Sequence, residues 1–141
     1  MQDMVDRIYA NRGSAANYVS SVTLGTSTSE SCSSPSTLAA RDRCQWSDTL
    51  QGSAETRGGS NVGAMIGARG CIELVQASNP AVGVCTPGIY RVSVAWQGLY
   101  KTAPPPSGPS GPTCGANQYG TEAQRRVIFT QISIGLPTCS S

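Results

Sequence analysis

Histidine is absent from the 141 residues of this chain, and its absence removes several kinds of active site. A Ser-His-Asp or Cys-His nucleophile pair, a histidine general base and a His-containing zinc site all require that side chain. The remaining candidates for acid–base chemistry are scattered carboxylates with no pair fixed by spacing: Asp42, Asp48, Glu55, Glu73 and Glu122. We therefore expect a protein that is not an enzyme, with no catalytic residues and no cofactor.

Strongly apolar residues are also scarce. Leu, Ile, Val and Phe number 24, about 17% of the chain, which is low for a domain that must bury a core. Disorder driven by charge repulsion is not expected, because the net charge is only +2 and charged residues make up 13% of the chain. The length suits a single domain spanning residues 1–141. Its six cysteines can supply the missing stability as three disulfides in an oxidising compartment.

The chain also lacks the features of a nucleic-acid or membrane-spanning protein. Its ten basic residues are scattered and its pI is near 8.3, whereas a nucleic-acid binder typically has a basic stripe and a pI above about 9. No apolar run is long enough to cross a bilayer. The first three residues do not open a signal peptide. We therefore expect no nucleic-acid partner, and we interpret the sequence as a processed or truncated chain.

The first segment, residues 1–12, is predicted to be a helix. Its apolar side chains have the spacing of one helical stripe: Met4, Val5, Ile8 and Tyr9. Arg12 and Gly13 suit a helix C-terminus, because Arg complements the dipole and Gly can adopt the left-handed cap conformation. No N-cap precedes the stripe. The segment is therefore interpreted as the last turns of a longer helix.

A second helix is predicted over residues 35–50. Pro35 suits its first position, because proline has no N–H and its φ is already helical. Asp42 falls on the apolar stripe of this helix, and we expect it to pair with Arg41 or Arg43. The segments on either side have little periodicity and are expected to be mostly loop: residues 14–34 and 51–69.

The second half of the chain predicts an antiparallel meander of strands over residues 71–75, 88–98 and 125–134. Alternate residues of the middle strand are apolar, so one of its faces is expected to be buried. Trp96 in this strand and Trp46 in the second helix are expected to be core anchors. Arg125-Arg126 is expected to be a solvated pair that protects a sheet edge. The connection 99–124 contains a Pro-rich run that cannot join the sheet, and it is interpreted as an exposed loop.

Six cysteines permit fifteen pairings, and local geometry favours one of them. Two cysteines flank the predicted hairpin turn, two would fix the second helix to the preceding loop, and two would hold the long connection to the last strand. In the chain-entropy model, closing either short loop is worth about 3 kcal/mol. No Cys-x2-Cys pair occurs, so a zinc site is not expected. The preferred bonds are Cys32–Cys44, Cys71–Cys85 and Cys114–Cys139.

Several local strings, spread over nearly the whole chain, resemble one known family. The string from Asp3 to Gly13 is similar to the family's exit from a long N-terminal helix, and Gln45-Trp46 is similar to its second helical segment. The sheet region is represented by Ile66–Ile72, Tyr90–Gly98, Cys114–Gly120 and Arg125-Arg126-Val127. As a set these strings resemble the type IV minor pilins, and within them the PilV group of pilus modification proteins.

This resemblance implies an α+β protein with the type IV pilin fold, in which a truncated N-terminal helix packs on an antiparallel β-sheet and disulfides stabilise the domain. Residues 1–13 would be the end of the long helix, and residues 14–69 the αβ-loop region. Residues 70–141 would form the sheet with its Pro-rich loop. The membrane-embedded half of the helix and the prepilin leader would lie upstream of residue 1.

The function that the resemblance implies is structural. A minor pilin joins other minor pilins, initiates assembly of the major pilin at the filament tip, and supports adhesion and twitching motility. Its expected location is the bacterial inner membrane and periplasm and the pilus filament. Two alternatives stay open: a pseudopilin of a type II secretion system, and a tip adhesin whose Pro-rich or Ser/Thr-rich loops bind a surface ligand.

Overall fold

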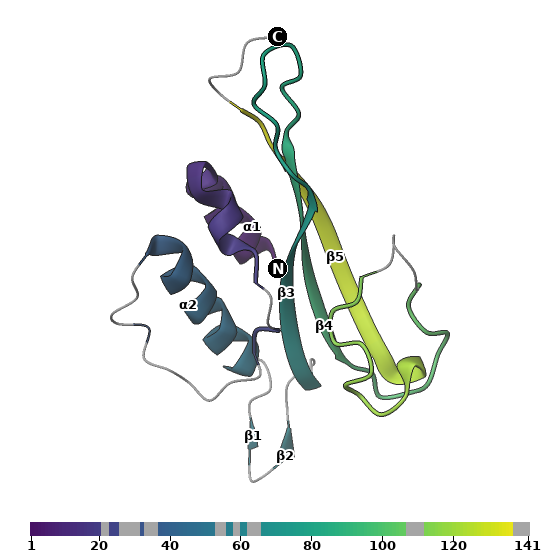
Figure 1. Cartoon of the computed structure of the whole chain (residues 1–141). Coiled ribbons are helices and arrows are strands. Elements are labelled where there is room, and N and C mark those ends of the chain that lie inside the picture. Colours follow the sequence, from purple (N-terminus) through teal and green to yellow (C-terminus); the bar gives the residue numbers. More distant parts are fainter. Residues whose placement is uncertain are drawn as a thin grey trace.

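A computed structural model of the chain describes residues 1–20, 23–25, 32, 37–52, 56–57, 60–61, 66–106 and 112–136. The protein is α+β: two helices and a 3-10 segment lie on one face of a three-stranded antiparallel sheet (Figure 1). The elements in chain order are α1 (Gln2–Ala10), η1 (Arg12–Tyr18), α2 (Leu38–Gly52), β1 (Thr56–Arg57), β2 (Ser60–Asn61), β3 (Ile66–Gln76), β4 (Gly88–Gln97), η2 (Glu122–Gln124) and β5 (Arg125–Ile134).

The main sheet has the order β3-β4-β5, so the predicted antiparallel meander is confirmed. Gly70 on β3 faces Val94 on β4, which faces Ile128 on β5. β3 begins at Ile66, earlier than predicted, because its first half also pairs with β4. The β3–β4 hairpin extends past the helices in Figure 1. A second, two-stranded sheet, β1-β2, occupies part of the segment that was expected to be loop.

Helix α1 buries the predicted stripe on the sheet, with Met4, Val5 and Ile8 at 0–5% exposure. Tyr9 is an exception at 44% exposure. The helix ends at Ala10, with Asn11 as its C-cap, and the chain continues directly into η1, most of which was expected to be loop. Tyr18 of η1 is fully buried, so this segment adds to the core. A single 3-10 segment carries too few apolar residues to produce a helical period in the sequence.

Helix α2 begins at Leu38, three residues later than predicted. Thr37 provides its N-terminal cap, because its Oγ1 accepts a hydrogen bond from the Ala40 N–H at 3.1 Å. Pro35 lies outside the described residues. No helix in the described part of the chain is long and apolar enough to cross a membrane.

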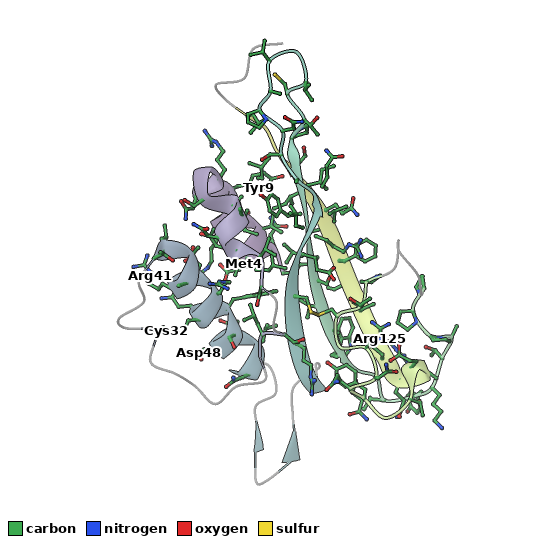
Figure 2. The ribbon with its side chains drawn as sticks, in the orientation of Figure 1. Met4, Tyr9, Cys32, Arg41, Asp48 and Arg125 are labelled. Atoms are coloured by element: carbon green, nitrogen blue, oxygen red, sulfur yellow. A yellow bond between two sulfur atoms is a disulfide. The ribbon has the colours of Figure 1, made fainter. Side chains whose placement is uncertain are left out.

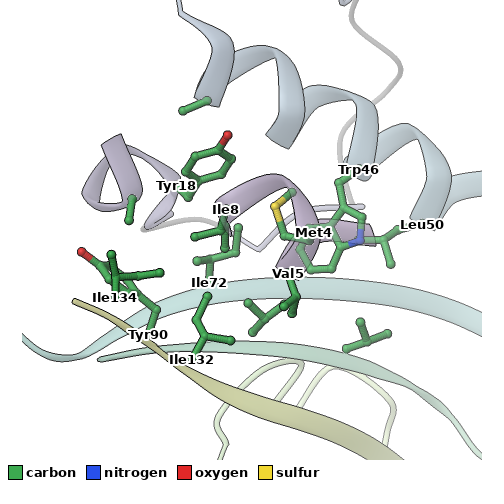
Figure 3. Close-up of a cluster of buried hydrophobic side chains, with 14 of the residues drawn as sticks. Met4, Val5, Ile8, Tyr18, Trp46, Leu50, Ile72, Tyr90, Ile132 and Ile134 are labelled. Carbon is green, nitrogen blue, oxygen red and sulfur yellow. The ribbon is translucent and has the colours of Figure 1, made fainter. Parts of the chain in front are cut away.

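The core lies between the helices and the sheet (Figure 3). Trp46 is 1% exposed and packs over Gly70, where an added Cβ would lie 2.5 Å from the indole ring. The sheet can therefore accept this ring only because residue 70 has no side chain. Trp46 is a core anchor, as predicted, and Trp96 packs at the margin of the same cluster. On the opposite face of β4, a smaller cluster is formed by Ala95, Cys114 and Tyr119.

Candidate functional site

The carboxylates that sequence analysis considered for catalysis are dispersed over the structure. Asp42 lies in the helical layer, bonded to Arg7 and Tyr18. Glu73 on β3 and Glu122 in η2 each lie beside a different arginine. Asp48 is exposed on α2, and Glu55 lies outside the described residues. Asp42, Glu73 and Glu122 therefore have separate partners, and the structure does not bring the four described acids together into an acid–base pair.

Asp42 connects three elements of the helical layer. Its Oδ1 accepts a hydrogen bond from Arg7 at 2.8 Å, and its Oδ2 accepts one from the Tyr18 hydroxyl at 2.5 Å. The expected pairing with Arg41 or Arg43 is wrong, because consecutive residues of a helix point in different directions. The aspartate instead turns inward, where it is 6% exposed. A buried carboxylate of this kind needs such partners, since an unpaired charge in the interior is very costly.

The pKa shifts in this cluster favour a charged Arg7 and a neutral Tyr18. Burial raises the pKa of Tyr18, and its hydrogen bond to Asp42 raises it further, so the phenol stays protonated. Burial alone would lower the pKa of Arg7, but hydrogen bonds to Asp3 and Asp42 and the charges of both carboxylates outweigh it and raise the pKa. Arg7 also donates to Gln45 at 2.6 Å. The cluster thus links α1, η1 and α2 by directional bonds.

The disulfides agree with sequence analysis at one bond and differ at the others. Cys32–Cys44 is the expected pair and lies beside α2. Cys71 bonds to Cys114, in place of the expected Cys71–Cys85 and Cys114–Cys139 bonds. Cys85 is disulfide-bonded as well, and Cys139 lies outside the described residues.

The register of the hairpin explains the changed pairing. Cys71 faces Ser93 across β3 and β4, far from the hairpin turn. Cys85 lies near that turn, next to the bridge between Asn79 and Thr86. At about 3.3 Å per residue, Cys71 and Cys85 are much too far apart along the strands to bond. Cys114 reaches Cys71 because the long connection folds back over this face, with a Cα–Cα distance of 5.7 Å.

One group of side chains has the spacing of a metal site but not its chemistry. Cys32, Cys44 and Asp48 bring their ligand atoms within 4.8 Å of one another. The two sulfur atoms are joined in a disulfide, so neither offers the thiolate that a metal would require. Figure 2 shows Cys32 and Asp48 beside α2. No other three His, Cys, Asp or Glu side chains of the described residues bring their ligand atoms as close together.

Arg125 holds the long connection against the sheet from the first residue of β5. It is 4% exposed and donates to the backbone oxygens of Pro112 and Cys114 at 3.1 and 3.0 Å. Its Nε also donates to Glu122 at 2.8 Å. The pKa of Glu122 is lowered, first by the hydrogen bond from the Asn117 N–H and then by Arg125, although partial burial opposes this.

Arg126 has a similar role on the other side of the strand. It donates to the backbone oxygens of Ala123 and Arg125, and also to that of Tyr100. The expectation that Arg125-Arg126 forms a solvated, edge-protecting pair is therefore wrong. Both guanidinium groups are bound to carbonyl oxygens, and Figure 2 shows Arg125 near the start of β5, beside the connection. Sequence gave no signal for this, because the partners are backbone groups in a loop.

Exposed large apolar side chains are spread over the described part of the chain: Tyr9, Leu38, Leu74 and Val75 lie on α1, α2 and β3, and the others lie at three places farther along the chain. Val82 and Val84 lie in the β3–β4 hairpin loop, at 86% and 53% exposure. Leu99 and Tyr100 follow β4 and are 77% and 78% exposed. The third place is β5, where two neighbouring residues, Ile128 and Phe129, are exposed on opposite faces of the strand.

A small pocket lies where η1, the base of the hairpin and the end of β5 meet. Its volume is about 230 Å³. Small and apolar residues form most of its wall, together with the Arg12 side chain and Tyr90. It is smaller than the usual range for a small-molecule site.

Comparisons with protein-family models, with curated proteins and with solved structures found no match for this chain.

Proposed function

We propose that this chain is the globular head of a non-enzymatic structural subunit, a minor pilin with the type IV pilin fold. The observation that carries the proposal is the packing of α1. Its apolar stripe lies along an antiparallel meander from its first residues, with Met4 fully buried and Met1 in contact with the core. This is the arrangement that the resemblance implies for the C-terminal half of a pilin helix.

A filament subunit must hold its head firmly on its helix, and the contacts of α1 suit that requirement. Arg7 connects the helix to Asp42 on α2, and Tyr18 connects the same carboxylate to η1. The disulfides at Cys44 and Cys71 fix the flanking segments covalently. Movement of α1 relative to the head would break buried, charge-assisted hydrogen bonds, which are among the stronger ones in proteins.

The partners in this proposal are other minor pilins and the major pilin, with a tip adhesin as a further candidate. The chain would be anchored in the bacterial inner membrane through the upstream part of its helix and would face the periplasm before assembly. The disulfides support an oxidising compartment of this kind. The exposed apolar groups on the hairpin, the long connection and β5 are surfaces for contacts with neighbouring subunits.

The proposal is tested by the gene and by the location of its product. We expect codons for about 20 to 25 apolar residues directly upstream of Gln2, preceded by a short basic leader. Antibodies raised against residues 1–141 should then detect the protein in filaments sheared from the cell surface. A start codon at Met1 with no apolar segment upstream would contradict the proposal. Detection only beside a secretion machinery, with no signal in sheared filaments, would favour the pseudopilin instead.

A further inference from the structure

The two edges of the main sheet differ in what covers them. β3 is partly paired on its outer side: Leu24 and Gly70 exchange backbone hydrogen bonds at 2.8 and 2.9 Å, and Ser20 donates to Ile72 at 3.1 Å. β5 forms the opposite edge and pairs with β4 alone. Figure 1 shows β5 at the margin of the sheet, with the long connection near its first residues.

The register of β4 and β5 determines which backbone groups of β5 point outward. The Gly98 N–H donates to the Gln124 oxygen at 2.7 Å, and Gln97 faces Arg125 in the next pair. In an antiparallel ladder, pairs that exchange hydrogen bonds alternate with pairs that do not. Even-numbered residues of β5 therefore bond to β4. The N–H and C=O groups of the odd-numbered residues face away from it: Arg125, Val127, Phe129, Gln131 and Ser133.

The outward groups from Val127 to Ser133 have no backbone partner among the described residues. Phe129, Gln131 and Ser133 are also exposed. Natural proteins usually protect such an edge with lysine, proline, a bulge or a covering segment. The sequence between Arg126 and Ile134 contains no charge and no proline, and the pairing with β4 is regular throughout. The arginines before it do not protect the edge, because they are bound to carbonyl oxygens.

We propose that this edge pairs with β5 of a second copy of the chain, in antiparallel orientation and centred on Phe129. In this register Val127 faces Gln131 of the other copy, so the free backbone groups of each copy find partners in the other. The Phe129 side chains lie opposite each other on one face, an arrangement that stabilises strand pairs. The antiparallel direction is favoured because it places the two Arg125-Arg126 pairs at opposite ends of the interface.

The size of this interface predicts a weak association. A stable complex typically buries roughly 1,200–2,000 Å² of surface. A single strand pair, with Ile128 and Phe129 on its two faces, would bury less than that. We therefore expect a reversible dimer that forms as concentration rises. The dimer would contain one continuous sheet with the strand order β3-β4-β5 of one copy followed by β5-β4-β3 of the other. The inference goes beyond the proposed function, since it concerns the purified chain alone and holds or fails without a filament.

Sedimentation velocity of the oxidised chain, from about 1 µM to about 1 mM, measures this association. The average mass should rise from monomer toward dimer over this range. Gln131→Pro removes an outward N–H while leaving every bond to β4 in place, so it should remain folded and monomeric. Gln131→Ala is the matched control, because it keeps the backbone donor and should dimerise like the wild type. Circular dichroism verifies that both variants retain the wild-type fold.

Amide hydrogen exchange locates the interface. Protection of the Phe129 and Gln131 amides should increase with concentration, whereas that of the Thr130 amide, already bonded to β4, should stay constant. A second variant, Phe129→Lys, places like charges opposite each other and should also prevent dimerisation. A chain that is monomeric at every concentration overturns the proposal and leaves the edge to a different partner. A dimer that forms equally well with Gln131→Pro overturns it as well.

Discussion

The substitution Gly70→Ala tests how α2 packs on the sheet. The added Cβ would lie 2.5 Å from two atoms of the Trp46 ring and 2.7 Å from Leu50 Cδ1. Trp46 is 1% exposed and Leu50 is 4% exposed, so neither side chain can move aside without disturbing the core. Overpacking of this kind typically lowers the free energy of unfolding by about 1–3 kcal/mol. Replacing glycine by alanine also reduces the entropy of the unfolded chain, which raises the free energy of unfolding by about 0.4–1 kcal/mol. We therefore expect a net loss of about 1–2 kcal/mol in the free energy of unfolding.

Urea unfolding of the oxidised chain, followed by tryptophan fluorescence, measures this loss as a lower midpoint. Gly13→Ala is the matched control, because nothing lies within 4 Å of its added Cβ, and its stability should be unchanged or slightly higher. In a Trp46→Phe background the cost of Gly70→Ala should fall, since the ring atoms that clash are removed. A neutral or stabilising Gly70→Ala, or an equal cost in both backgrounds, would refute the described packing.

Three further predictions concern the polar contacts and the disulfides. Tyr18→Phe should lower the free energy of unfolding by about 1.5–3 kcal/mol in urea titrations, because it removes a buried hydrogen bond to the charged Asp42, whereas Tyr9→Phe at an exposed site should have no effect. Because the folded pKa of Glu122 is lowered, its contribution is present at neutral pH and is lost as the pH falls through that value. Glu122→Gln should thus be less stable than wild type near pH 7, with the difference closing below about pH 4; a constant difference would contradict the described contacts. Non-reducing peptide mapping should recover Cys71–Cys114, and a Cys71–Cys85 peptide would contradict the described hairpin.

Local patterns in the sequence were sufficient for most of the regular elements. The apolar stripe of α1 and the alternation in β4 each lie within a few turns or residues, so their periods are visible without knowledge of the fold. β5 has the bounds that were predicted for it, Arg125–Ile134. The cap at Thr37 shows the usual limit of such predictions, because Pro35, two residues earlier, is an equally good helix start in sequence terms.

Several of the contacts that could not be predicted from the sequence depend on the return of a distant segment. Asp42 bonds to Arg7 across the helical layer, 35 residues away in the chain. Cys114 reaches Cys71, and Arg125 becomes buried, because the connection between β4 and β5 folds over the outer face of the sheet. A Pro-rich composition predicts that this connection stays out of the sheet, but not which face of the sheet it covers. The exposed edge of β5 likewise became visible only once the strand order and register were known.

The most direct test of the proposed function is a count of surface filaments on the cells that carry this gene. We expect deletion of the gene to reduce the number of filaments strongly and to abolish twitching motility, and we expect the wild-type gene to restore both. A complemented strain with Gly70→Ala, whose α2 is less firmly seated on the sheet, should restore fewer filaments than one with Gly13→Ala. Unchanged filament numbers and motility after deletion would contradict the assignment of this chain to pilus assembly.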